Sequence, residues 1–217
     1  MAEPPEKRND EPEPGRQGRF TLLETGGGPD RGKVNPPGTG TLGMWILLAS
    51  LAMLFLTSMA GYLYIRFSQP SWPPPGMPHL PSGLWISTVV LISCSVTGHL
   101  ALVAIRRDDA RGLARMLTVT LVLGALFLIL QTVNYLILAR ENLTAATNLY
   151  GFTFYMLTGL HALHVIGGLI PLVVTLRRAR VGRYTSFFHQ GVRHVVLYWH
   201  FLDAVWIVVF ACLLLGS

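Results

Sequence analysis

Five long apolar segments, separated by short polar connections, follow a polar stretch at residues 1–40. They cover residues 42–65, 83–105, 116–139, 151–176 and 195–215, and each reaches the roughly 20 residues that a helix needs to cross a bilayer. Their apolar residues do not alternate with polar ones, as the strands of a membrane β-barrel would require. The pattern therefore predicts an all-α protein, a polytopic membrane helix bundle with five transmembrane helices.

Charged residues are scarce, and all but Asp203 lie outside these segments. Only 13% of the 217 residues are charged, against about a quarter in soluble domains. Residues 1–40 hold six Lys or Arg, and the second and fourth connections hold four and five, whereas Arg66 and Arg140 alone lie on the other side. The positive-inside rule then predicts a cytoplasmic N-terminus. Topology accounts for the net charge of +6, so we expect no nucleic-acid partner.

Residues 1–40 are rich in proline and charge and poor in apolar side chains. Such a composition predicts a disordered segment, here a cytoplasmic tail. The segment also lacks the short apolar core of a signal peptide. We therefore predict two parts, a tail at 1–40 and a five-helix transmembrane domain at 41–217.

The second to fifth segments each carry a stripe of polar or small residues on one helix face, at spacings of three, four and seven. Small residues let membrane helices approach one another, and polar ones form hydrogen bonds across the interface. We therefore expect a packed bundle with a partly polar seam, and a kink at Pro171. The stripes are Thr88, Ser95 and His99; Thr120, Gly124, Gln131 and Asn134; Thr158, His161, His164 and Gly168; and Trp199, His200, Asp203 and Trp206.

A metal or haem site is one interpretation of the histidines. His161 and His164 are three residues apart and share a helix face, a spacing that can bind a metal, and histidine is a common haem ligand. However, no other segment repeats such a pair, and no carboxylate accompanies this one. The two cysteines fall singly in different segments, which argues against a thiol or cysteine-ligated centre. We favour histidines that bond to neighbouring helices.

Asp203 is the only acid within an apolar segment, and His200 precedes it by three residues. An intramembrane carboxylate costs roughly 2.5–3.5 kcal/mol to insert and is a functional candidate by default. It can conduct protons, or it can form a structural contact with a histidine or arginine. A proton path would need more titratable groups along it than this segment offers, so we favour the structural contact, with conduction as the alternative.

Two sequence stretches resemble a known family. The stretch "YWHFLDAVWIVVF" (198–210) is similar to the Tyr-Trp-His-Phe-Val-Asp run, followed by Val-Trp, of subunit III of the haem–copper respiratory oxidases, with Leu202 replacing Val. The stretch "FYMLTGLHALHVIGGL" (154–169) is similar to that family's Thr-Gly-Phe-His-Gly-Leu-His-Val segment. Weaker matches lie at 42–50, 72–74 and 131–135. The resemblance covers residues 41–216 and is to the five-span bacterial type.

The resemblance implies a non-catalytic subunit of cytochrome c oxidase in the bacterial plasma membrane. It implies that haem and copper lie in partner subunits, that subunit I is the direct partner, with subunit II and other subunits in the same complex, and that this chain supports sustained turnover of the proton-pumping complex. It also implies a structural phospholipid, which we expect between the first two spans and the other three. Under it, His161, His164, His200 and Asp203 become an intramembrane polar network. The candidates for a helix seam or lipid cleft are His99, Asn134, Tyr198, Trp199 and Trp206.

Three positions depart from the family pattern. Many relatives have a glutamate where this chain has Leu51, Asn134 and Arg193. The first of these glutamates is suspected of feeding protons toward subunit I, so we assign no proton role to Leu51. Two other functions remain open at this point: a matching subunit of a nitric oxide reductase-type complex, and, from a different class, a haem-binding membrane anchor.

Overall fold

The structure is a computed structural model that describes residues 39–77 and 81–215. In that part of the chain it contains five helices and no strand, and each helix is long and apolar enough to span a membrane. The prediction of an all-α membrane bundle is therefore confirmed. All but the last two residues of the predicted tail lie outside the described residues, and the side of the membrane that the N-terminus occupies stays a prediction. The helices are α1 (Thr39–Ser68), α2 (Gly83–Arg106), α3 (Ala110–Arg140), α4 (Leu149–Arg180) and α5 (Gln190–Leu214).

Helices α3 and α5 begin at least five residues earlier than the apolar pattern predicts, and for α3 a local hydrogen bond sets the start. The α3 helix begins at Ala110, where the Asp109 carboxylate accepts a hydrogen bond from the Gly112 amide at 2.8 Å. Such caps satisfy amide groups that have no partner in the first turn. The α5 helix begins at Gln190, five residues before the apolar segment. The α4 helix continues through Pro171 to Arg180 as one helix, and a kink there stays a prediction.

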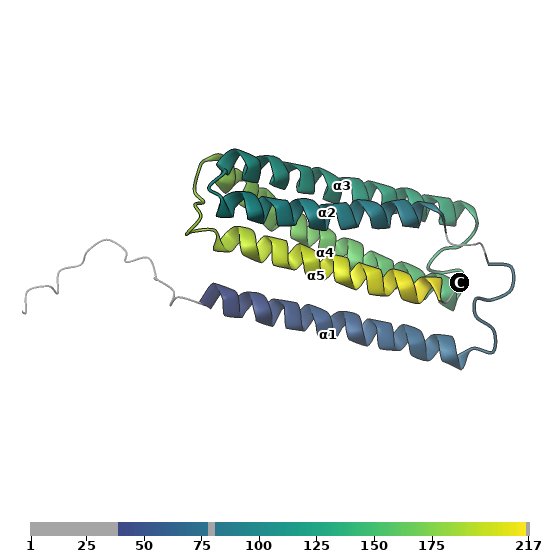
Figure 1. The fold of residues 1–217 in the computed structure, drawn as a ribbon. Coiled ribbons are helices and arrows are strands. Elements are labelled where there is room, and N and C mark those ends of the chain that lie inside the picture. The colour runs from purple at the N-terminus through teal and green to yellow at the C-terminus, as the bar shows by residue number, and fades with distance from the viewer. Residues whose placement is uncertain (1–38, 78–80, 216–217) are drawn as a thin grey trace, which may run out of the picture. The chain divides into compact units, whose positions relative to one another are not determined.

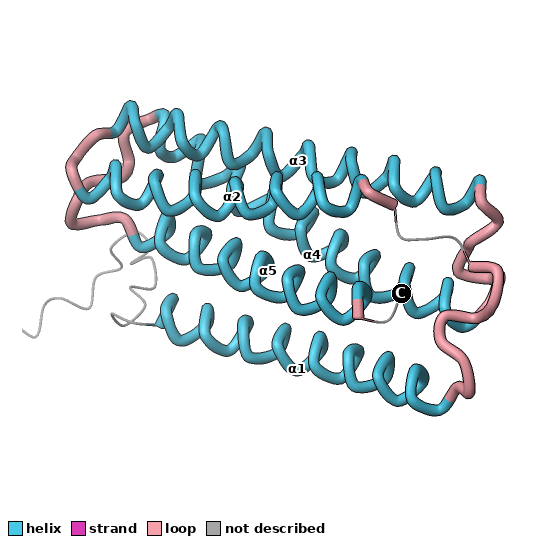
Figure 2. The backbone as a smooth tube through the Cα atoms, turned by 45° about the vertical axis from the view of Figure 1, so that its right-hand side comes forward, coloured by secondary structure: helices cyan, strands magenta, loops and turns pink. Residues whose placement is uncertain are grey.

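Helices α2 to α5 pack into a four-helix group, and α1 lies beside it (Figure 1). The α2 helix contacts α3 and α5, and α4 contacts the same two helices, whereas α1 contacts only α4 and α5 within the described residues. Figure 2 shows the same separation of α1 from α2. The expected pairing of the first two spans is therefore wrong. Their connection, residues 69–82, is long enough for α2 to cross to α3 and α5, which its polar stripe faces.

The first connection anchors one end of α1 through aromatic contacts. The Trp72 ring packs edge-on against Tyr62 of α1 and Tyr150 of α4, with ring centroids 6.0 and 5.3 Å apart. Tyr62 is fully buried, and its hydroxyl donates a hydrogen bond to the Cys212 carbonyl of α5 at 3.2 Å. These contacts attach the end of α1 to α4 and α5, although the middle of α1 is loosely packed.

A carboxylate joins two connections at the opposite, arginine-rich end of the bundle. Asp108, between α2 and α3, accepts hydrogen bonds from the Ser186 amide at 2.7 Å and the Ser186 hydroxyl at 2.8 Å, between α4 and α5. The backbone amide bond, followed by the hydroxyl bond, holds the pKa of Asp108 below its ordinary value. Asp108 also has a positive φ of 55°, a conformation that Asp and Asn tolerate better than most residues.

We predict that Asp108→Ala lowers the thermal midpoint of the protein in detergent, because both hydrogen bonds to Ser186 are lost. A lowered folded-state pKa contributes stability above the ordinary value of about 3.9, and that contribution is lost as the pH falls through the folded pKa. The midpoints of wild type and variant should therefore differ at pH 7 and converge below about pH 4. Asp108→Asn is the control, since it keeps an acceptor and tolerates the positive φ. A difference that persists unchanged at low pH would contradict the assignment.

Candidate functional site

Trp206 of α5 lies where four helices meet. Its indole nitrogen donates a hydrogen bond to the Thr88 hydroxyl of α2 at 3.0 Å. Its ring meets Phe127 of α3 edge-on at 5.2 Å and His161 of α4 at 5.0 Å between centroids. Edge-to-face aromatic pairs at such distances contribute beyond the area they bury. One side chain thus connects α5 to α2, α3 and α4.

His161 extends this cluster to α1. The residue is 0% exposed, and its ring centroid lies 5.7 Å from that of Phe127 and 6.3 Å from that of Phe55 on α1. Neither ring nitrogen has a hydrogen-bond partner among the described residues. The imidazole therefore serves here as an aromatic packing element, enclosed by rings from α1, α3 and α5. We call Phe55, Thr88, Phe127, His161 and Trp206 the central cluster.

His164 lies one turn further along α4 and faces α1. Its Nδ1 is 2.7 Å from the Leu160 carbonyl of its own helix, and its ring is 5.2 Å from that of Phe55. The His164 carbonyl accepts a hydrogen bond from the Tyr198 hydroxyl of α5 at 3.0 Å. A Cβ at Gly168 would lie 2.7 Å from the Tyr198 ring. The absence of a side chain at Gly168 thus lets α4 and α5 approach closely enough for this bond.

Trp199 fills the seam between α5 and α3. It is buried, and a Cβ at Gly124 would lie 2.7 Å from its ring. Its indole nitrogen has no hydrogen-bond partner among the described residues. Close approach at a small residue is a usual way in which membrane helices pack. Gly124 is thus the position of the α3 stripe at which Trp199 of α5 approaches α3.

His200 of α5 and His99 of α2 lie together where these two helices meet. The Nδ1 atom of His200 shares a short hydrogen bond with the Ser95 hydroxyl of α2. The rings of His99 and His200 are 6.2 Å apart between centroids. His99 is exposed and His200 half-buried, so this pair faces outward between α2 and α5.

Asp203 is 5% exposed and points into the bundle near α2. The side chains of Cys94 and Ser95 of α2 lie near its carboxylate. Neither carboxylate oxygen has a hydrogen bond within the described residues. No hydrogen bond joins Asp203 to a histidine or arginine among the described residues, and the structural contact expected from the sequence stays a prediction.

Asn134 occupies a buried position between α3 and the start of α2. Its amide nitrogen donates to the Ser87 hydroxyl at 3.3 Å. The other two departures from the family pattern lie elsewhere: Leu51 of α1 is nearly buried, and Arg193 is exposed at the start of α5. Asn134 thus joins α3 to α2 by a side-chain hydrogen bond.

The structure divides the four residues of the predicted polar network into two pairs. His161 and His164 lie on the α4 side of the bundle, facing α1 and α3, whereas His200 and Asp203 lie beside α2. No hydrogen bond described by the structure joins the two pairs. Within residues 39–77 and 81–215, no three His, Cys, Asp or Glu side chains gather as a group of metal ligands.

Sequence reasoning missed the aromatic partners of these residues. Phe127 lies on the same face of α3 as Gly124 and Gln131, and Phe55 projects from α1, for which no polar stripe was expected. Including aromatic residues in the stripe of the third segment would have found Phe127. No local signal identifies Phe55, because its role depends on which helix α1 lies against.

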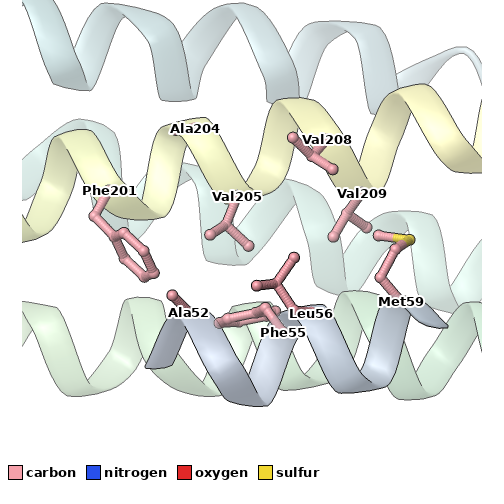
Figure 3. A pocket seen from close by; sticks show the side chains of 9 residues that line it. All are labelled: Ala52, Phe55, Leu56, Met59, Phe201, Ala204, Val205, Val208 and Val209. Carbon is pink, nitrogen blue, oxygen red and sulfur yellow. The ribbon is translucent and has the colours of Figure 1, made fainter. Parts of the chain in front are cut away.

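Grooves flank α1 on both sides. Between α1 and α5 lies an apolar hollow of about 260 Å³, with Ala52 on one wall and Ala204 on the other (Figure 3). A second hollow of about 490 Å³ shares Ala52 and Phe201 with it and reaches His200. On the other side, a hollow of about 410 Å³ is lined by α1, α4 and α5. The lining residues of this last hollow are Met44, Leu47, Leu51, His164, Gly167, Pro171, His194, Val195 and Tyr198.

Comparison with known proteins gives consistent matches. Residues 37–216 match the family described as cytochrome c oxidase subunit III. The chain is 38% identical over 178 residues to cytochrome c oxidase subunit 3 of Thermostichus vulcanus, a match that covers 82% of this chain and 87% of that protein. It is 38% identical over 176 residues to the protein of the same name from Synechocystis sp., covering 80% and 74%. It is 37% identical over 180 residues to a probable cytochrome c oxidase subunit 3 of Nocardia farcinica, covering 82% and 88%.

We predict that Trp206→Phe lowers the free energy of unfolding by about 1–3 kcal/mol, because it removes the hydrogen bond to Thr88 and part of a buried ring. Trp85→Phe is the matched control, since Trp85 is 58% exposed on α2. Unfolding in mixed micelles, followed by circular dichroism, gives the measurement.

A double variant tests the contact itself. Thr88→Val should cost less in the Trp206→Phe background than in wild type, since the two residues share one hydrogen bond. Strictly additive effects would contradict the role assigned to this bond.

Proposed function

Because the chain belongs to the cytochrome c oxidase subunit III family, we propose that it acts as a non-catalytic subunit of an oxygen-reducing haem–copper oxidase. It is a multi-pass protein of the bacterial plasma membrane. In this role it stabilises the complex and sustains its turnover. The match over residues 37–216, which includes all five helices, is the observation that carries the proposal. The names of the relatives favour an oxidase over a nitric oxide reductase-type complex or a haem-binding anchor.

In this proposal, the haem and copper centres lie in the partner subunits. His161, the most deeply buried histidine of the motif stretches, is enclosed by the rings of Phe55, Phe127 and Trp206. This packing supports a structural role for the imidazole over haem ligation. Subunit I, which carries haem and copper in this family, is the direct partner, and subunit II is a further neighbour. The two family motifs of this chain then serve to hold its own helices together.

We predict that an affinity-tagged form of this chain, isolated from bacterial membranes in mild detergent, retains a larger haem- and copper-containing subunit. Absorbance of the preparation should show haem, and mass spectrometry should identify subunits I and II in a fixed ratio to this chain. The same preparation from cells that lack subunit I should contain no haem. A chain recovered intact and alone from wild-type membranes would refute the proposal.

Structural phospholipid is a further part of this proposal, and we assign it to the grooves beside α1. The nine residues around the smaller α1/α5 hollow are all apolar, which suits an acyl chain (Figure 3). The groove between α1 and α4 has apolar walls and, toward the arginine-rich end, His194, whose Nε2 is 3.3 Å from the Thr41 hydroxyl. Lipid at these places would supply the packing that α1 lacks. This proposed lipid site differs from the one expected from the sequence, since within the described residues α1 contacts α4 and α5 and not α2.

We predict that Ala204→Phe, which fills the α1/α5 groove, lowers the amount of phospholipid that remains bound to the purified complex. Ala125→Phe is the control, because it makes the same change at an exposed position on α3. Lipid extraction and mass spectrometry, normalised to protein, measure the difference. Equal phospholipid content in both variants and in wild type would contradict the assignment of lipid to this groove.

A further inference from the structure

The α2/α5 face presents two imidazoles at a depth where hydrocarbon would surround them. His99 lies seven residues before Arg106 in α2, and His200 lies seven residues after Arg193 in α5. At a rise of 1.5 Å per residue, both rings are roughly 10 Å from the arginines, inside a hydrocarbon layer about 30 Å thick. Histidine is too short to extend its polar atoms over that distance to the headgroups.

Other exposed polar side chains of the spans form hydrogen bonds within their own helix. The hydroxyls of Ser50, Thr57 and Thr132 each donate to the carbonyl four residues earlier in their own helix, at 2.8–2.9 Å. The His164 imidazole bonds in the same way, with Nδ1 2.7 Å from the Leu160 carbonyl, whereas within the described residues His99 and His200 form no such bond to their own helix. Among the described residues, neither nitrogen of His99 has a hydrogen-bond partner, and His200 bonds only through Nδ1 to Ser95.

The surface around these rings is shaped to receive a side chain. A groove of about 260 Å³ lies between α2 and α5, lined by Ser95, Val96, His99, Leu100 and His200. Val96 and Leu100 give it an apolar rim and are 54% and 46% exposed. His200 also lines the larger hollow between α5 and α1, so the face continues across α5 to α1, helices that lie side by side in Figure 1.

We propose that a transmembrane helix of a partner subunit covers this α2/α5 face and presents a hydrogen-bonding side chain to His99 and His200. The inference rests on the proposed function, because it requires that the chain be part of a complex. An acyl chain cannot satisfy an imidazole, and an unsatisfied polar group in hydrocarbon costs several kcal/mol. Phospholipid headgroups remain about 10 Å away. A polar residue on a neighbouring helix satisfies both rings, as polar side chains do between membrane helices.

Site-specific photocrosslinking in the assembled complex tests this face. Leu100→benzoylphenylalanine should form an adduct whose mass equals this chain plus a partner subunit. Leu136→benzoylphenylalanine, at a residue that is 58% exposed on α3, is the control and should form that adduct to a much smaller extent. Adducts of Leu100→benzoylphenylalanine with lipid only, with detergent only, or with a second copy of this chain would overturn the proposal.

Variants of His99 test the hydrogen bond. His99→Phe should weaken retention of the chain by the complex on the order of fivefold as detergent is raised, the loss expected for one interhelical hydrogen bond. His99→Gln, which keeps donor and acceptor atoms, should restore most of it. Equal retention of both variants and wild type would overturn the proposal. If the wild-type chain does not co-purify with a haem-containing subunit, the proposed function itself fails. If it does co-purify but partner adducts form only from the Leu136 position, the proposed function stands and only the assignment of the partner helix to the α2/α5 face is rejected.

Discussion

The contact between the Trp206 indole and the Thr88 hydroxyl is the interaction on which the arrangement of the bundle depends. In a bilayer, lipid tails are as apolar as leucine, so burial of apolar surface does little to choose helix partners. Which helices pack together depends instead on the shapes of their surfaces and on a few polar contacts between them. Trp206 bonds to α2 and packs on Phe127 of α3 and His161 of α4, so a single side chain sets the relation of α5 to three neighbours.

The position of α1 follows from what the central cluster offers it. Phe55 is the contribution of α1 to that cluster, and among the described residues its aromatic ring contacts are with His161 and His164. The remaining ties of α1 lie near its ends, where Thr41 meets His194 and Tyr62 bonds to the Cys212 carbonyl. Leu48, Leu51 and Met59 of α1 are also buried, but α1 contacts α4 and α5 at few points along its length. The grooves on both sides of α1 are therefore a consequence of how few residues attach it.

The sequence predicts what is local and misses what depends on partners. Apolar length is a local property, and all five helices follow from it. The start of α3 was missed because it depends on the Asp109 cap, a hydrogen bond that apolarity does not reveal. Asn134 and Trp206 of the stripes bond across to α2, since residues three and four apart share a face that can meet a neighbouring helix. The division of the polar residues into two groups, and the separation of α1 from α2, depend on which helices meet, which no single segment encodes.

The family motif of α5 makes sense once that helix is seen to have neighbours on several sides. Tyr198 reaches α4, Trp199 packs on α3, and His200 bonds to Ser95 of α2. Consecutive residues point about 100° apart, so three in a row serve three directions. Asp203, one turn on from His200, also lies near Ser95. The acid, Ser95, His200 and His99 thus follow one another from the interior to the α2/α5 face. Within the part of the chain that the structure describes, the carboxylate at the inner end of that row accepts no hydrogen bond, while the outer end faces the groove lined by Ser95, His99 and His200.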